Sequence, residues 1–194
     1  TLGELFGIAL DVYEARGLKR SREDILKDLY EFFGLRVRNV LSEAGIRYDI
    51  VDAVMASGFD DPRLAVKRAE AVAAAVARGD AFKAAVDAFN RVCNLAAKAE
   101  HANVDPSRFE VEAERKLREA HASARVRAEE ALAEGDAAKA LDALAELKDP
   151  INVYFDSVMV MTDDAAVRSN RLAQLAAVAA DIRRIADFAK IVWS

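Results

Sequence analysis

The residue types that most often carry catalysis or bind metals are few in this sequence and widely separated. His101 and His121 lie twenty residues apart on Ala- and charge-rich stretches, outside any His-x-x-x-His or His-Asp metal pattern, so both are predicted to face solvent. Cys93 falls on an apolar helix face without a nearby His and is predicted to be a buried, inert thiol. Asp163 and Asp164 could form an acid/base or metal pair, but their place before a helical pattern favours an N-cap.

The search for a glycine-rich phosphate loop is also negative. These patterns predict no catalytic residue, no metal site and no cofactor. An enzymatic role for these residues alone is therefore disfavoured, and a binding role is expected.

The elements that would carry such a role are predicted to be helices. The chain of 194 residues is 53% hydrophobic but only 7% aromatic, with 8 Gly and 3 Pro, a composition typical of an Ala-rich helical protein. Each proline follows an aspartate, at Asp61-Pro62, Asp105-Pro106 and Asp149-Pro150, and each pair predicts a helix start. The expected fold is all-α, a bundle of about nine helices over 2–15, 21–44, 48–56, 62–78, 80–100, 106–134, 136–147, 150–161 and 163–192.

The stretch 150–161 is apolar on almost every side, which predicts a central helix enclosed by the others, with Ile151, Tyr154, Phe155, Val158 and Met159 in the core. Helix 106–134 has a narrow apolar stripe and should lie outside with one side in water. For helix 21–44 the predicted core stripe is Leu26, Leu29, Phe33, Val37, Val40 and Ala44. The last helix is predicted to bury Leu172, Leu175, Val178, Ile182, Ile185 and Ala189 and to carry Arg168, Arg171, Arg184 and Asp187 on its other face.

The formal net charge of −5 argues against a nucleic-acid binder, but the charge is unevenly distributed. Residues 16–47 hold 8 Lys+Arg against 5 Asp+Glu, residues 62–104 hold 7 against 4, and residues 107–149 hold 8 against 11. Because salt screens each surface charge beyond roughly 10 Å, a local basic face can still bind phosphate. The single cysteine excludes an internal disulfide, and no segment is typical of a membrane span or a signal peptide, so a soluble, cytoplasmic protein is expected.

Four sequence blocks carry a family resemblance. They are FFGLRVRNVLSEAGIRYDIVDAVMASG, FDDPRLAVKRAEAV, AFNRVCNLAAK, and LKDPINVYFDSVMVMTDDAAVRSNRLAQLAAV followed by IADFAK. In this order, over about residues 24–192, they resemble the carboxy-terminal part of the β subunit of the bacterial heterotetrameric glycyl-tRNA synthetase. The resemblance implies a DALR-type helical anticodon-binding domain over 21–194, with 1–20 as a connecting helix from the upstream part of the subunit.

The same resemblance implies the partners. These are the tRNA(Gly) anticodon stem-loop, the upstream domains of the β subunit, and the α subunit, which would carry out aminoacylation. It implies no membrane partner. An alternative left open is a helical scaffold that binds protein within the synthetase without touching RNA, which the acidic total charge favours.

Three groups of residues are then candidates for RNA contact: Arg36, Arg38 and Asn39; Arg91 and Asn94; and Arg168, Asn170 and Arg171. The second and third bases of the implied anticodon are cytosines, which present an amino donor and two acceptors, so Arg and Asn suit the acceptors. Arg also suits phosphates and can stack on bases. Each group has a rival structural role, and for the third group holding the last helix against its neighbours is the favoured one.

Overall fold

The computed structural model describes residues 1–14 and 17–193, and no strand occurs within them. The elements are α1 (Leu2–Glu14), α2 (Arg22–Glu43), α3 (Tyr48–Ala56), α4 (Pro62–Val76), α5 (Asp80–Ala96), the 3-10 turn η1 (Pro106–Arg108), α6 (Glu112–Ala133), α7 (Ala137–Ala145), α8 (Lys148–Ser157), α9 (Ala165–Arg183) and the 3-10 turn η2 (Phe188–Lys190). The all-α prediction is confirmed. The predicted end of the first helix, at residue 15, lies outside the described residues.

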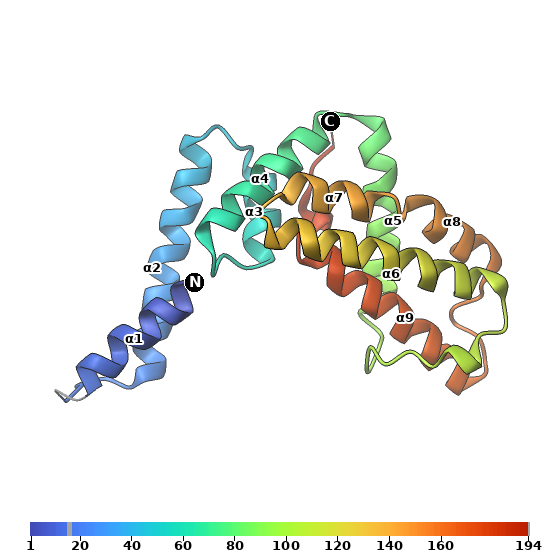
Figure 1. Ribbon diagram of the computed structural model, residues 1–194, viewed down its shortest axis with the longest axis horizontal. Helices are drawn as coiled ribbons and strands as arrows, with labels where there is room; N and C mark the ends of the chain where they lie inside the picture. The colour runs from blue at the N-terminus through green and yellow to red at the C-terminus, as the bar shows by residue number, and fades with distance from the viewer. Residues whose placement is uncertain (15–16, 194) are drawn as a thin grey trace.

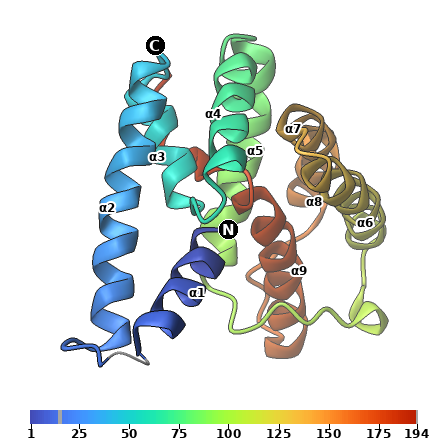
Figure 2. The same ribbon diagram turned by 60° about the vertical axis from the view of Figure 1, so that its left-hand side comes forward.

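The molecule is elongated, with a helical hairpin at one end and a bundle at the other (Figure 1). The hairpin consists of α1 and α2, and α3 and α4 connect it to the bundle of α5 to α9. Within the bundle, α6 packs along α7 and α8, while α5 packs along α9 (Figure 2). One continuous apolar core runs from α2 to η2, and α6 covers its outer side with one face in water, as predicted.

Aromatic contacts hold the hairpin together and set which face of α2 is buried. The Phe6 ring lies 5.4 Å from Tyr30 and 5.2 Å from Phe33, centroid to centroid. Phe59 packs so closely on Gly34 that a Cβ there would come within 3.1 Å of its ring. The buried face therefore includes Gly34, Val37 and Leu41, and the predicted stripe was wrong at Val40 and Ala44, which are exposed.

Two of the three Asp-Pro pairs do not start the helices predicted for them. Asp61 caps α4 by accepting from the Arg63 and Leu64 amides at 2.9 and 3.2 Å. Asp105, however, starts only the turn η1, because buried Phe109 has an extended backbone and α6 begins at Glu112. Asp149 is not a cap, since α8 already begins at Lys148.

The last helix is shorter than predicted because the buried side chain of Arg68 fixes its end. The Arg68 guanidinium donates to the carbonyl oxygens of Arg184, Ile185, Ser57 and Gly58, which are at the carboxyl ends of α9 and α3. A cation is favourable at a helix carboxyl end. The chain turns there into η2, and Ala189 is exposed rather than buried.

The predicted central helix lies at the edge of the bundle instead of being enclosed. Helix α8 packs on α5 and α6, and it buries Ile151 and Tyr154 completely. The helix ends at Ser157, so Met159 points into solvent with 76% of its surface exposed, although Val158 is buried. The prediction failed because the apolar residues continue past the end of α8 into the loop that leads to α9.

His121 is buried, which corrects the predicted exposure. Its Nε2 lies 2.7 Å from Asp181 Oδ2, and both side chains lie between α6 and α9. His101 is exposed, as predicted. Cys93 is half-buried, and burial raises the pKa of its thiol.

Candidate nucleic-acid interface

The outer face of α5 carries a row of polar side chains at helical spacing. Lys83, Asp87, Arg91 and Asn94 are separated by four, four and three residues, and Lys98 follows just past the helix end. All five are exposed, whereas the opposite face of α5 is buried against the core. Side chains with these separations share one side of a helix. The row therefore presents three cations, one carboxylate and an amide on one surface.

Arg91 connects this row to α8. Its guanidinium carbon lies 4.4 Å from the centroid of the Phe155 ring, within the range of a cation–π contact. Nη1 also donates a hydrogen bond of 3.4 Å to Asn152 Oδ1, on the same helix. Among the described residues, Arg91 has no carboxylate within ion-pair distance, so its charge is not neutralised by the protein. A flat cation on a half-buried ring is a surface on which a base or a phosphate can bind.

A pocket of about 320 Å³ lies beside the end of this row, between the segment after α5 and the start of α9. It is lined by Lys98, Glu100, Met161, Ala165, Arg168, Ser169 and Leu172. Arg168 donates to the Thr162 carbonyl at 2.6 Å and the Asp163 carbonyl at 3.3 Å, which fixes the connection between α8 and α9. Asp164 caps α9 by accepting from the Ala166 and Val167 amides, as predicted for the Asp163-Asp164 pair.

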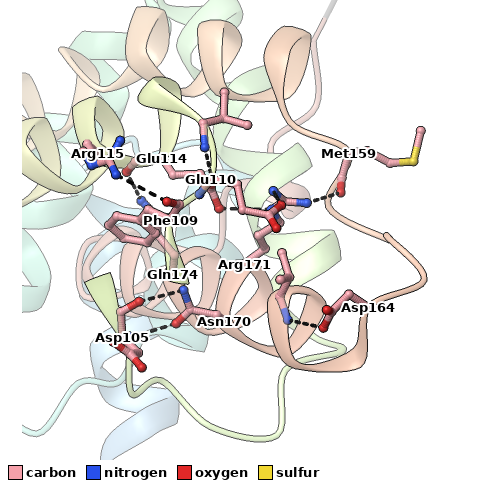
Figure 3. A network of polar contacts seen from close by, with 12 residues as sticks. Asp105, Phe109, Glu110, Glu114, Arg115, Met159, Asp164, Asn170, Arg171 and Gln174 are labelled. Atoms are coloured by element: carbon pink, nitrogen blue, oxygen red, sulfur yellow. Dashed lines mark hydrogen bonds and ion pairs between the residues drawn. The ribbon is translucent and has the colours of Figure 1, made fainter. Parts of the chain in front are cut away.

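Asn170 and Arg171 are almost completely buried, and their side chains bind neighbouring segments of the chain (Figure 3). The Asn170 side chain accepts from the Asp105 amide at 2.7 Å and donates to the Asp105 carbonyl at 3.0 Å. Arg171 donates to Glu114 Oε1 at 3.0 Å, to Glu110 Oε2 at 2.9 Å and to the Met159 carbonyl at 3.1 Å. These contacts hold the loops around the pocket, and the predicted solvent-facing position of Arg171 was wrong.

Glu114 is the centre of this network and is fully buried. Its Oε2 accepts from the amides of Glu110 and Val111 at 2.8 Å each, at the start of α6. Burial alone would lower the pKa of Arg171, but the hydrogen bond and charge of Glu114 raise it. The guanidinium and both glutamates thus join α6, α9 and the end of α8 in one polar cluster.

The residues predicted on α2 lie far from this surface. Figures 1 and 2 both place α2 at the opposite end of the molecule from α8 and α9. The Arg36 guanidinium carbon lies 5.6 Å from the Phe32 ring centroid, and Asn39 is exposed. Arg38 forms an ion pair with Asp52 of α3. Arg91 and Asn94 share one face of α5, and Arg168 lines the pocket beside Lys98 at the end of that face, whereas Arg36, Arg38 and Asn39 form a separate group.

Two residues of this candidate surface, Lys98 and Phe155, were not predicted from the sequence. Lys98 lies four residues after Asn94, and this spacing could have identified it. Phe155 was assigned to the core, but it is half-buried beneath Arg91. No pattern within α8 could have revealed this, because the partner of Phe155 comes from another helix.

Other kinds of site find no support in the described ranges, 1–14 and 17–193. No group of three or more His, Cys, Asp or Glu side chains there is arranged to hold a metal ion. Within the same ranges, every helix is too short or too polar to cross a bilayer.

Comparison with known proteins shows similarity to one domain family and to longer proteins. The DALR anticodon binding domain family matches residues 86–191, a range that includes Arg91, Asn94 and Arg168 but not α2. The chain is 40% identical over 171 residues to the glycine--tRNA ligase beta subunit of Halalkalibacterium halodurans, covering 88% of this chain and 24% of that protein. It is 38% identical over 192 residues to that of Syntrophus aciditrophicus, covering 99% and 28%. The chain thus spans about a quarter of the length of these relatives.

Proposed function

Because the chain belongs to the DALR anticodon binding domain family, we propose that the outer face of α5, together with Phe155 and Arg168, binds the anticodon stem-loop of a transfer RNA. The names of the relatives make tRNA(Gly) the preferred ligand. In this proposal the chain is the anticodon-binding part of a cytoplasmic glycine--tRNA ligase β subunit. It takes no part in the chemistry of aminoacylation, which a separate α subunit carries out.

The observation that carries the proposal is the Arg91–Phe155 contact inside the family-matched range. Bases of an anticodon loop can leave the stack and rest on aromatic or guanidinium planes. Arg91 is already held over such a ring without a carboxylate partner, so an incoming base or phosphate meets an uncompensated positive charge. Asn94, one turn along, offers the amide donor and acceptor that a base edge requires.

Lys98 and Arg168 extend the positive surface to the pocket. Phosphate contacts position an RNA without selecting its sequence, whereas contacts to base edges select it. We therefore assign backbone positioning to Lys98 and Arg168, and base contact to Arg91 and Asn94. Asn170 and Arg171 are assigned to the framework of the bundle, because both side chains are almost completely buried, whereas Arg168 is half-buried and lines the pocket.

The test is binding of a tRNA(Gly) anticodon stem-loop, measured by fluorescence anisotropy across a salt series. Arg91→Ala should weaken binding by about 1–3 kcal/mol, the usual cost of losing a stacking or guanidinium contact to a base. Arg127→Ala is a matched control, because Arg127 is an exposed arginine on α6 that is paired with Glu146 at 2.7 Å. Equal losses in both variants would contradict the proposed location.

Two further arms separate the alternatives. Replacing the anticodon cytosines should weaken binding if base edges are read, whereas a pure phosphate binder would respond to salt and ignore the change. Arg36→Ala with Arg38→Ala should lower the affinity without changing the melting temperature only if α2 also touches the RNA. An absence of binding at low salt would leave the protein-binding scaffold as the function.

A further inference from the structure

A second pocket, of about 380 Å³, opens between α6, α9 and the segment 102–104. From α6 it is lined by Arg118, His121 and Arg125, which are three and four residues apart and therefore share one side of the helix. On the α9 side the lining residue is Ala177, whose small side chain leaves the space open. None of the lining residues carries a carboxylate. All the ionisable side chains of this pocket are therefore basic.

The positive charge of the two arginines is only partly neutralised by the surrounding protein. Arg118 is exposed and has no carboxylate within ion-pair distance among the described residues. Arg125 pairs with Glu129 at 3.0 Å, but Glu129 also pairs with Arg184 at 3.0 Å. One negative charge is thus shared between two arginines. An anion that enters the pocket meets uncompensated positive charge.

His121 forms the inner wall of the pocket. It is only 9% exposed, and its Nε2 lies 2.7 Å from Asp181 Oδ2. The other ring nitrogen, Nδ1, has no hydrogen-bond partner among the described residues. In the protonated ring both nitrogens carry hydrogen, so His121 can donate to Asp181 and to an anion at the same time. Asp181 also lies 3.6 Å from Arg184, so this carboxylate too is shared between two basic groups.

The segment 102–104 brings backbone donors to the opposite wall. The amides of Ala102, Asn103 and Val104 donate to no protein acceptor within the part of the chain that the structure describes. Arginine side chains and free backbone amides are the groups that most often bind phosphate oxygens in proteins. A tetrahedral phosphate can accept from donors on several sides at once, and here they come from α6 and from this segment. The chemistry of the lining therefore favours a phosphate group.

A smaller pocket, of about 260 Å³, connects this site to the surface proposed to bind RNA. It shares Asn103 with the basic pocket, and it shares Ser169 with the pocket beside Lys98. Its one carboxylate, Asp105, is paired with Arg108 at 3.2 Å. The three pockets thus adjoin one another from the end of α5, past the start of α9, to the outer side of α6.

We propose that the pocket formed by Arg118, His121 and Arg125 is a phosphate-binding site, and that it takes a backbone phosphate of the RNA whose anticodon loop binds α5. The phosphate site depends only on the residues of the pocket, whereas RNA as the source of the phosphate rests on the proposed function. Backbone phosphates are alike at every position of an RNA. This site therefore adds affinity and orients the stem without reading its sequence.

The first measurement titrates the chain with inorganic phosphate at constant ionic strength and follows the ring of His121 by NMR. The chain contains only two histidines, His101 and His121, so the ring signals can be assigned readily. The His121 signals should move saturably with phosphate. In Arg118→Gln the apparent Kd should rise about tenfold or more, because a charge-assisted hydrogen bond is lost. Lys116→Gln removes the same charge from another side of α6 and should leave the Kd unchanged.

The second measurement repeats the stem-loop salt series with the same two variants. Arg118→Gln should weaken binding equally for every anticodon sequence and lower the slope of log affinity against log salt by about 1, whereas Lys116→Gln should not. Its melting temperature should equal that of the parent, since Arg118 is exposed.

The two measurements separate the site from the source of its phosphate. If phosphate saturates the pocket but the stem-loop affinity ignores Arg118→Gln, the ligand is a free phosphate compound and RNA as the source is wrong. If the parent chain binds no stem-loop while His121 still responds to phosphate, the proposed function fails and the phosphate site stands. The site itself is overturned if the His121 signals show no saturable response, or if Arg118→Gln leaves both the phosphate and the stem-loop affinities unchanged.

Discussion

Replacing Arg171 with Met should destabilise the fold strongly, because it leaves the buried carboxylate of Glu114 without its cationic partner. Glu114 is fully buried and its Oε1 lies 3.0 Å from Arg171 Nε. Removing one partner of a buried ion pair typically costs 3–5 kcal/mol. Here Oε2 keeps its two backbone donors, Glu110 and Val111, so the lower end, about 3 kcal/mol, is expected. For a chain of this size that corresponds to a fall in melting temperature of about 6–12 °C.

The second variant in this test combines Arg171→Met with Glu114→Gln. The glutamine oxygen can take the place of Oε2 and accept from both backbone amides, and no charge remains buried. The double variant should therefore recover most of the loss, to within about 1–2 kcal/mol of the parent. Urea unfolding of the parent, Arg171→Met, Glu114→Gln and the double variant gives the coupling energy directly.

The matched control is Arg127→Met, since Arg127 is exposed and pairs with Glu146 at 2.7 Å on the surface. It should change the melting temperature little. The reasoning would be refuted if Arg171→Met lowered the free energy of unfolding by less than about 1 kcal/mol, or if the double variant were as unstable as the single one. Stem-loop affinity should be preserved in the double variant below its melting temperature. A loss of affinity in the double variant would indicate that Arg171 contacts the RNA.

Three other predictions concern the interior. Tyr154→Ala should cost about 3–5 kcal/mol of unfolding free energy by urea, because the side chain is completely buried. Tyr154→Phe should be neutral or stabilising by about 1 kcal/mol, since the buried hydroxyl has no hydrogen-bond partner among the described residues; a large loss would contradict this. Burial would raise the pKa of Asp181, but the hydrogen bond from His121 and the charges of His121, Arg125 and Arg184 together lower the pKa below the ordinary value of 3.8. A lowered carboxyl pKa stabilises the fold above that value, and the stabilisation is lost as the pH falls through the folded-state pKa. Asp181→Asn should therefore flatten the fall in unfolding free energy as the pH drops below about 4, and an unchanged slope would show that the pair contributes nothing.

The fold class and most helix positions could be predicted because they depend on local signals. Asp61-Pro62 and the glycines with positive φ, such as Gly45 and Gly79, mark helix ends through the backbone preferences of those residues themselves. Two of the failures depend on distant partners. Helix α9 ends where Arg68, more than a hundred residues earlier, binds its last carbonyls. The Val40 error arose because Phe59, outside α2, determines which side of that helix is covered.

The candidate RNA surface shows the same division between local and distant causes. Arg91 and Asn94 could be identified from spacing along one helix, but their relation to Phe155 and Arg168 depends on how α5, α8 and α9 pack. Arg171 supports the connection between α8 and α9 from inside the bundle, because it donates hydrogen bonds to the Met159 carbonyl and to Glu114. The connection between α8 and α9 is therefore held on its inner side by the buried side chain of Arg171, while its outer side is exposed. Because Arg171 is buried, its replacement together with Glu114→Gln should leave stem-loop affinity unchanged while the fold is intact, whereas Arg91→Ala should lower the affinity directly.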